Sequence, residues 1–147
     1  MTSILWFKRD LRLADHSALD AALRHGPVVP VFVHEPDYWQ QDDVSGRQYA
    51  FLRDCVLDLR DALRARGADL VIRQGDAVAV LDALTAETDA TRLFSHEETG
   101  NAWTFARDRR VAAWARDRGI AWHELPQQAV IRGRHDRDRW AAHRNRF

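Results

Sequence analysis

Cysteine, lysine and long apolar runs are scarce in this 147-residue sequence. Cys55 is the only cysteine, which excludes a disulfide framework and a cysteine-based metal site. No apolar run approaches the ~20 residues that cross a membrane, and no secretory leader precedes the first apolar run, so we expect a cytoplasmic protein without a membrane partner. The 22 basic and 22 acidic side chains cancel, so net charge indicates no nucleic-acid partner either.

Three common site motifs are also missing. The sequence contains no GxGxxG after its first apolar run, no GxxxxGK[ST] and no GxSxG. The first absence argues against a dinucleotide at the start of the first helix, and the second excludes a phosphate-binding P-loop. The third, with no persuasive Cys-His pair, removes the common nucleophilic enzymes.

What the sequence does contain is a regular alternation of short apolar runs and longer segments with helical periodicity. This alternation predicts an α/β fold, Rossmann-like and doubly wound, with a five-stranded parallel sheet and helices on both faces. The expected strands are 3–7, 28–33, 69–73, 92–95 and 120–124. The expected helices are 15–25, 45–66, one opening at Asp76, and 102–118, and the segment 34–44 is expected to be a polar loop.

The last part of the chain breaks this alternation. We expect residues 1–125 to form the α/β domain and 126–147 to form a basic tail. The tail carries six arginines, of which Arg132 and Arg134 come first. Such a run could follow DNA phosphates, although Asp136 and Asp138 dilute its charge.

Three loops should meet where the parallel strands end, because this sheet class binds ligands beyond the carboxyl ends of its strands. They are 8–12, 34–39 and 96–101. Within the first loop, Asp10 either orders the turn, by pairing with Arg12 or capping the next helix, or contacts a ligand. Lys8 and Arg9 are less needed for the fold and are therefore better candidates for ligand contact.

The third loop, HEETGN, raises a metal-site hypothesis through His96, Glu97 and Glu98. Neighbours in an extended loop point in different directions, and no HExxH or repeated histidine pattern supports the site, so we expect no metal. Gly100 suits a bend and Asn101 suits the N-cap of the following helix.

Four stretches resemble the photolyase and cryptochrome flavoprotein family, in the family's order and over essentially the whole chain. They are LWFKRDLRLADHSAL, VFVHEPDYW, SGRQYAFL and GNAWTFARDRRV. The resemblance implies an amino-terminal antenna-binding domain facing a larger helical domain, absent here, that binds FAD and damaged DNA. The tail 126–147 would then begin the linker to that domain, and this chain alone would not be catalytic.

The resemblance implies a deoxyribodipyrimidine photolyase, which repairs ultraviolet pyrimidine lesions in DNA with light, as the parent protein. A cryptochrome-type blue-light photoreceptor is the nearest alternative. A stand-alone Rossmann-like protein that binds a nucleotide or flavin is the alternative from another class.

The same resemblance suggests which antenna pigment is bound. Family members with a deazaflavin use basic residues that match Arg9 and Arg47. Members with a folate use an Asn-Glu pair where this sequence has Trp103 and Thr104, so a deazaflavin or flavin, or an empty cleft, is favoured over a folate. Phe7, Val33 or Phe51 would supply an apolar wall. The other expected cleft residues are Lys8, Asp10, His34, Glu35, Glu98 and Asn101.

Overall fold

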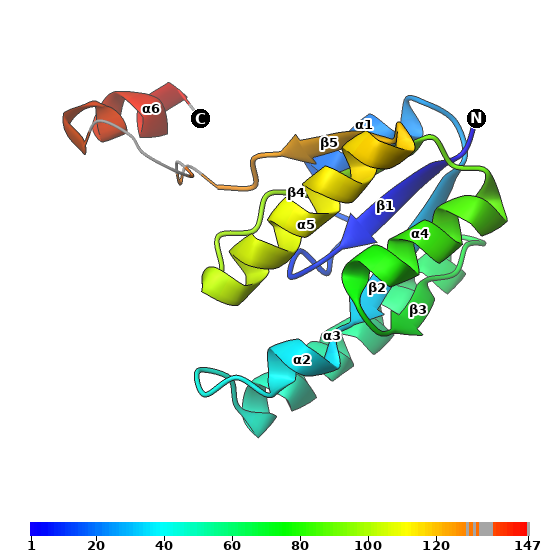
Figure 1. The fold of residues 1–147 in the computed structure, drawn as a ribbon, viewed down its shortest axis with the longest axis horizontal. Helices are drawn as coiled ribbons and strands as arrows, with labels where there is room; N and C mark the ends of the chain where they lie inside the picture. The colour runs from blue at the N-terminus through cyan, green and yellow to red at the C-terminus, as the bar shows by residue number, and fades with distance from the viewer. Residues whose placement is uncertain (129, 131, 133–136, 147) are drawn as a thin grey trace.

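The computed structural model describes residues 1–128, 130, 132 and 137–146, and its core is one parallel sheet with the strand order β3-β2-β1-β4-β5 (Figure 1). The strands are β1 (Ser3–Phe7), β2 (Val28–His34), β3 (Val71–Gln74), β4 (Arg92–His96) and β5 (Ala121–Leu125). The helices are α1 (Ser17–Leu23), α2 (Pro36–Trp39), α3 (Gly46–Arg64), α4 (Ala77–Thr88), α5 (Ala102–Arg118) and α6 (Trp140–Arg146), with a 3-10 turn, η1 (Arg137–Arg139), before the last.

The strand order reverses beside β1, and this confirms the doubly wound prediction. From β1 the chain moves outward through β2 to β3, and then returns to place β4 on the other side of β1. In such sheets the reversal opens a crevice at the carboxyl ends of the two central strands. Here those ends carry Phe7 and His96.

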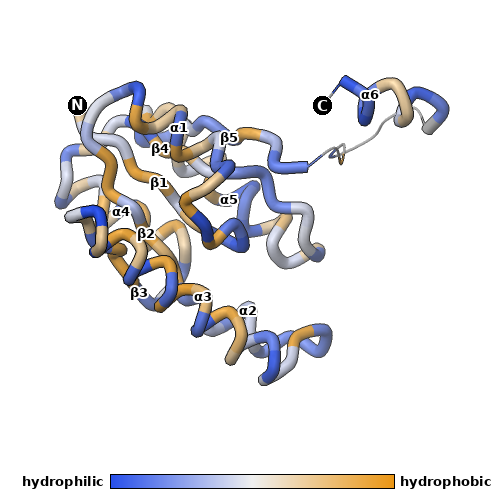
Figure 2. Tube along the Cα trace, turned by 180° about the vertical axis from the view of Figure 1, so that it is seen from behind, coloured by the Kyte–Doolittle hydropathy of each residue, from blue (hydrophilic) through white to orange (hydrophobic). Residues whose placement is uncertain are grey.

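Two hydrophobic clusters hold the layers together, one on each face of the sheet. Side chains of β1 alternate between the faces, as expected for a strand covered on both sides. Trp6 packs under α4 and α5 with Leu81, while Phe7 packs under α1 and α3 with Leu59. Figure 2 shows hydrophobic residues along the central strands and a mixture of hydrophobic and hydrophilic residues along the helices that cover them.

Three helices begin at the predicted residues, Ser45, Asp76 and Asn101, and each of these side chains caps its helix. Ser45 and Gln48 form a reciprocal capping box at the start of α3. Asp76 accepts from the backbone N–H of Ala79 at 3.1 Å, and Asn101 accepts from that of Thr104 at 3.1 Å. These side chains satisfy backbone donors that the first helical turn leaves without partners, which is why the sequence predicts these boundaries well.

The predicted loop 34–44 is wrong in one respect, because it contains the short helix α2. Pro36 occupies the first helical position, where its missing N–H costs nothing and its fixed φ favours a helix. In the tail, Arg134 and Asp136 lie outside the described residues.

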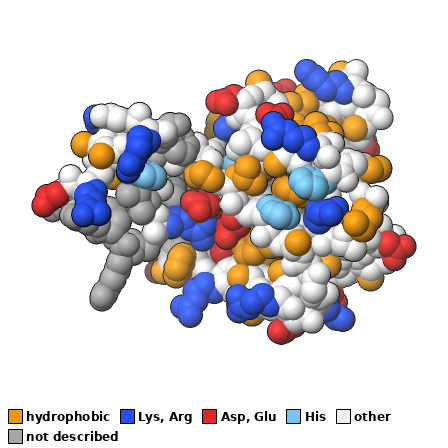
Figure 3. All heavy atoms as spheres, turned by 90° about the horizontal axis from the view of Figure 1, so that it is seen from above, with side chains coloured by type: hydrophobic (Ala, Val, Ile, Leu, Met, Phe, Trp, Pro, Cys, Tyr) orange, Lys and Arg blue, Asp and Glu red, His pale blue; other side chains and the backbone are white. Residues whose placement is uncertain are grey.

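None of the helices in the described part of the chain is long and apolar enough to cross a membrane. Figure 3 shows acidic and basic side chains interspersed on one face of the molecule.

Candidate functional site

Lys8 leaves the end of β1 as a buried cation. Its Nζ lies 3.2 Å from Asp108 Oδ2 on α5 and 4.4 Å from the ring centroid of Trp6. The Lys8 side chain is only 4% exposed, and a buried charge needs such a partner to offset its lost hydration. Lys8 therefore joins the loop after β1 to α5, so the prediction that it is less needed for the fold is wrong, although it also lines a cavity described below.

Arg9 reaches further out and stacks on aromatic rings. Its guanidinium lies 4.5 Å from the ring centroid of Tyr38 and 5.7 Å from that of Trp39, both on α2. Its Nε is 3.8 Å from Glu98. At this separation the pair leaves the guanidinium donors available for a stronger charge-assisted hydrogen bond.

Arg9 and Tyr38 line two cavities at once. The first, of about 190 Å³, extends along the loop after β4 toward Gln127 and Gln128. The second, of about 520 Å³, lies between the loop after β1, α2 and the first turns of α3. The second cavity is also lined by Leu11, Arg12, Trp39, Gln48, Phe51, Leu52 and Cys55. An apolar wall with a few polar groups is the usual composition of a small-molecule site.

The expected apolar wall is only partly correct. Phe51 is 73% exposed and lines the larger cavity, as predicted. Phe7 and Val33, however, belong to the two hydrophobic clusters and are almost fully buried, because the sheet is covered on both faces. The side chains of Tyr38 and Trp39 supply the rest of the apolar wall, because the short helix α2 places both rings beside Arg9.

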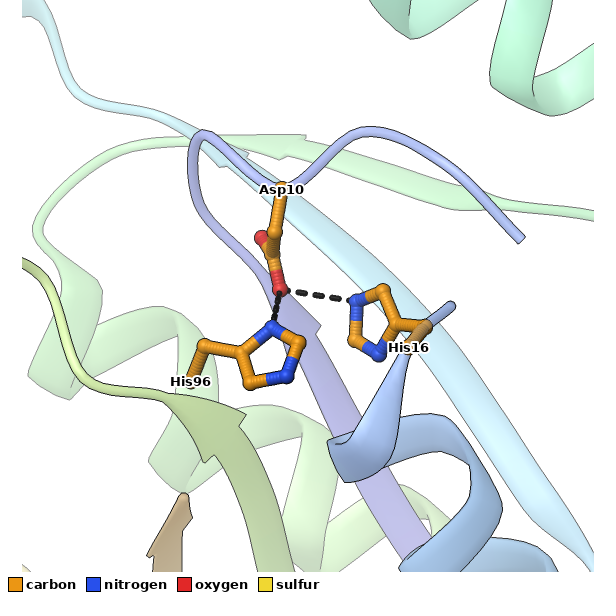
Figure 4. Close-up of side chains that lie close together, drawn as sticks. All are labelled: Asp10, His16 and His96. Atoms are coloured by element: carbon orange, nitrogen blue, oxygen red, sulfur yellow. Dashed lines mark hydrogen bonds and ion pairs between the residues drawn. The ribbon is translucent and has the colours of Figure 1, made fainter. Parts of the chain in front are cut away.

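Asp10 is the centre of a buried hydrogen-bonded cluster (Figure 4). Its Oδ1 accepts from the backbone N–H of Lys8 at 2.8 Å. Its Oδ2 lies 2.8 Å from His16 Nε2 and 2.8 Å from His96 Nδ1. Burial would raise the pKa of Asp10, but the contacts from the two imidazoles and the backbone N–H outweigh it and hold this pKa well below its usual range.

Asp10 orders the loop after β1, as one of the two predictions for it stated, but it does so through other partners than the predicted one. Asp10 does not pair with the side chain of Arg12, whose guanidinium instead donates to the backbone oxygen of Asp15. It ties the loop after β1 to the start of α1 and to the end of β4. The tie orders the edge of the crevice.

The three side chains Asp10, His16 and His96 have the composition of a metal site, and their ligand atoms lie within 4.8 Å of one another. The surrounding donors argue against one. His16 Nδ1 accepts from the backbone N–H of Leu19, so the neutral ring carries its proton on Nε2, which lies 2.8 Å from Asp10 Oδ2 without the alignment of a regular hydrogen bond. If Nε2 bound a metal, the proton of the neutral ring would move to Nδ1, and Nδ1 could no longer accept from Leu19 and cap α1. Contacts among the three side chains therefore account for this cluster better than a metal does.

Arg107, on the inner face of α5, collects three carboxylates. Its Nη1 donates to Glu35 at 2.6 Å, its Nε donates to Asp108 at 3.0 Å, and its Nη2 donates to Glu98. The same guanidinium lies 4.9 Å from the ring centroid of Trp6. Although burial opposes the charge, the carboxylates raise the pKa of Arg107 further above its usual value, so it stays a fixed cation.

Glu35 is the least satisfied member of this network. Burial is the main cause that raises its pKa, to about 7, and repulsion from Glu98 adds to this while Arg107 partly offsets it. Its second oxygen, Oε1, is buried and has no hydrogen-bond partner among the described residues. Glu35 also lines a third cavity of about 160 Å³, beside Trp103. It can therefore change protonation state near neutral pH.

Three of the predicted site residues, His34, Arg47 and Asn101, are not among those that line the two cavities shared by Arg9 and Tyr38. His34 contacts Tyr49 and lines a separate cavity of about 300 Å³ against α3 and β3. Arg47 is exposed in the first turn of α3. The side-chain amide of Asn101 donates to Gln41 and Asp43 and so connects the start of α5 to the segment after α2.

Arg107 and Asp108 were not among the predicted site residues, although the sequence carries a signal for them. On α5 the buried positions include Thr104, Val111 and Trp114, which follow helical spacing. Arg107 and Asp108 fall on that same inward stripe. A charged pair on an otherwise buried helix face requires buried partners of opposite charge, which the loops after β1, β2 and β4 supply.

The first arginine of the tail is already paired. Arg132 Nη1 donates to Glu124 at 2.8 Å, and its Nη2 lies 3.9 Å from Asp108. Glu124 thus occupies one of the two terminal nitrogens of this guanidinium, while Asp108 adds only a longer-range attraction. Contact of Arg132 with DNA stays a prediction, which a salt titration can test.

Comparison with known proteins identifies relatives along most of the chain. The family model described as DNA photolyase matches residues 3–136. An uncharacterized 31.6 kDa protein of Synechococcus sp. (strain PCC 6716) is 40% identical over 128 residues, which cover 86% of this chain and 45% of that protein. A cryptochrome DASH of Natronomonas pharaonis is 32% identical over 126 residues, covering 82% of this chain and 26% of that protein.

A solved structure is similar to this chain in both fold and sequence. The crystal structure of a bacterial class III photolyase from Agrobacterium tumefaciens matches with a TM-score of 0.81 and 31% identity, over 92% of this chain and 28% of that one. This chain therefore spans less than half the length of each of these three proteins.

The arrangement as a whole suits binding of a planar ligand. It offers stacked rings, an exposed arginine and two adjoining cavities at the switch point of the sheet. The charges around Arg107 and Lys8 are largely matched within the protein, so they fix the shape of the crevice.

Proposed function

This chain belongs to the DNA photolyase family, and we propose that its α/β domain holds a light-harvesting pigment of the deazaflavin or flavin type. The single observation that carries the proposal is the position of Arg9. It stacks on Tyr38 in the wall shared by two cavities, at the carboxyl end of β1.

The larger cavity has the chemistry that such a pigment needs. Trp39 and Phe51 offer faces for an isoalloxazine-like ring, and Arg9 and Arg12 offer charge for an acidic ring edge or a phosphate. Gln48 adds a neutral amide at the first turn of α3. Energy transfer requires only a fixed position and orientation, so the cavity needs no acid-base pair.

A folate is the less favoured pigment. The positions at which folate-binding members are expected to carry an Asn-Glu pair hold Trp103 and Thr104. Thr104 is buried, and its hydroxyl donates to the backbone oxygen of Asn101. Trp103 lies against Tyr38 and Arg107. Neither side chain offers the pair of polar groups that a pterin edge would need.

For the whole protein, we propose a deoxyribodipyrimidine photolyase that repairs ultraviolet pyrimidine lesions with light. In that reading residues 1–125 form the pigment domain, and 126–147 lead toward a helical domain that binds FAD and damaged DNA. The likeness to a class III photolyase over 92% of the chain supports this reading. The likeness to a cryptochrome DASH keeps a blue-light photoreceptor as the second candidate.

The pigment proposal is tested by fluorescence titration of the purified chain with riboflavin, FMN, a deazaflavin and a reduced folate. We expect deazaflavin or flavin binding that Arg9→Ala weakens about tenfold to a hundredfold, the loss of one charge-assisted hydrogen bond. Arg47→Ala tests the second basic residue, which the sequence resemblance implies and which is exposed in the first turn of α3, the helix that lines the larger cavity.

Arg53→Ala is the matched control, because Arg53 is an exposed arginine of α3 that lines the separate 300 Å³ cavity. Equal affinity in wild type and Arg9→Ala would contradict the proposed site. A loss in Arg53→Ala alone would place the ligand in that other cavity.

The size of the native gene product separates a domain from a stand-alone binding protein. An antibody raised against this chain should detect a product several hundred residues longer. A product of 147 residues would instead favour a free-standing nucleotide- or flavin-binding protein and would remove light-driven repair.

A further inference from the structure

We propose that Ser17 is an activated nucleophile, with His96 as its general base and Asp10 as the residue that orients His96. Ser17 Oγ lies 2.8 Å from His96 Nε2, and His96 Nδ1 lies 2.8 Å from Asp10 Oδ2. A nucleophile within hydrogen-bond reach of a base, which a third group orients in turn, is the arrangement of a serine hydrolase triad. This inference is independent of pigment binding.

The neighbouring donors determine which nitrogen of His96 carries the proton. The backbone N–H of Ala18 points at Nε2 from 3.4 Å, so Nε2 is an acceptor. The hydroxyl of Ser17 can then donate to Nε2, while Nδ1–H donates to Asp10. This is the tautomer that a general base for Ser17 requires.

Asp10 is held firmly enough to act as the orienting group. Its other oxygen accepts from the backbone N–H of Lys8, and His16 contacts the same oxygen as His96 does (Figure 4). Asp10 and His96 are 2% and 3% exposed. A buried, fully contacted carboxylate keeps both its position and its charge, which stabilises an imidazolium that forms on His96.

Ser17 differs from the other serines of the chain in being both exposed and paired with an imidazole. Ser3 and Ser95 are buried. Ser45 is exposed at the start of α3, but its hydroxyl accepts from the backbone of Gln48, and no histidine among the described residues hydrogen-bonds to it. Ser45 therefore provides a comparison within the same molecule.

The chemical class of substrate is a small activated ester or a comparable acyl or sulfonyl donor. Ser17 Oγ would attack the carbonyl carbon while His96 Nε2 takes the hydroxyl proton and passes it to the departing alcohol. Water, activated by the same imidazole, would then cleave the acyl-serine and restore Ser17, so that ester and water give acid and alcohol. The described contacts assign no oxyanion donor, so we expect reaction with good leaving groups rather than with stable esters.

Treatment of the full chain with a sulfonyl fluoride, followed by peptide mapping, tests the proposal. We expect labelling of Ser17 at least a hundredfold faster than that of Ser45, the usual contribution of general-base catalysis. We also expect p-nitrophenyl acetate to acylate Ser17 and release nitrophenolate, and Ser17→Ala to abolish that release. Equal labelling of Ser17 and Ser45 in the wild type would overturn the proposal, whether or not any variant folds.

His96→Gln separates activation from simple exposure. Ser17 stays exposed in this variant, but the base is gone, so its labelling should fall to the rate of Ser45 while the circular dichroism spectrum is retained. Labelling at the wild-type rate in folded His96→Gln would overturn the role of the base.

The orienting role of Asp10 has a spectroscopic test. Nitrogen-15 spectra of the imidazole rings should show His96 protonated on Nδ1 in the wild type. In Asp10→Asn that preference should weaken, and Ser17 labelling should fall with it. A wild-type His96 protonated on Nε2 would remove both the base and its orienting residue.

Discussion

Lys8 Nζ and Asp108 Oδ2 lie 3.2 Å apart although 100 positions separate the two residues. The pair joins the loop after β1 to the inner face of α5. Arg107 and Arg132 converge on the same carboxylate group of Asp108, so the crevice is bounded by one connected set of charges. Attraction between the opposite charges of this set offsets the hydration that each buried charge loses.

Asp108→Asn should destabilise the domain by roughly 3 kcal/mol, because it leaves the buried cations Lys8 and Arg107 without their shared anion. Urea unfolding at neutral pH measures the change. Asp117→Asn, an exposed position on the same helix, should stay within about 0.5 kcal/mol of wild type. Equal stabilities of the two variants would show that the buried pair contributes little.

Asp10 should make the fold sensitive to acid. Its folded-state pKa lies below the value of about 3.9 for an unfolded aspartate, so its contribution is present above that pH and is lost as the pH falls through the folded value. Unfolding of wild type and Asp10→Asn from pH 7 to pH 3 should show a stability gap that narrows below about pH 4. A gap that stays constant down to pH 3 would contradict this assignment.

Glu35 should make the fold less stable as the pH rises, which is the opposite of the effect of Asp10. Its pKa rises from an ordinary 4.5 to about 7 in the fold, so the unfolded chain releases this proton first and stability falls as the pH rises between those values. Glu35→Gln removes that loss. Relative to wild type, the variant should therefore gain stability between pH 4 and pH 8, by at most about 3 kcal/mol. Parallel stability curves would show that the Glu35 carboxyl titrates normally.

Arg132→Ala should leave DNA affinity and its dependence on salt unchanged, because Glu124 already binds this guanidinium and Asp108 attracts it. Titration at two salt concentrations measures both quantities, since each phosphate contact adds to the slope. Arg146→Ala, in exposed α6, is the comparison within the tail. A smaller slope for Arg132→Ala would confirm the tail as a DNA contact.

Local chemistry explains why so much of the fold could be predicted. Ser45, Asp76 and Asn101 each cap the helix that follows them, and these bonds span only three residues. The strand β1 is also marked by a local signal. A strand covered by helices on both faces of the sheet has apolar residues at successive positions, and such a run can be recognised in the sequence. The helix α2 escaped prediction because its four residues are too few for a periodic pattern.

Sequence alone determined the parallel α/β sheet, the helix caps and the expectation that charged loops meet beyond the strand ends. Tertiary structure decided the partners within those loops. Arg107 meets Glu35 across 72 positions, and His96 meets Asp10 across 86. No local pattern encodes such pairings, because they depend on which strands become neighbours and on the need of each buried charge for a partner.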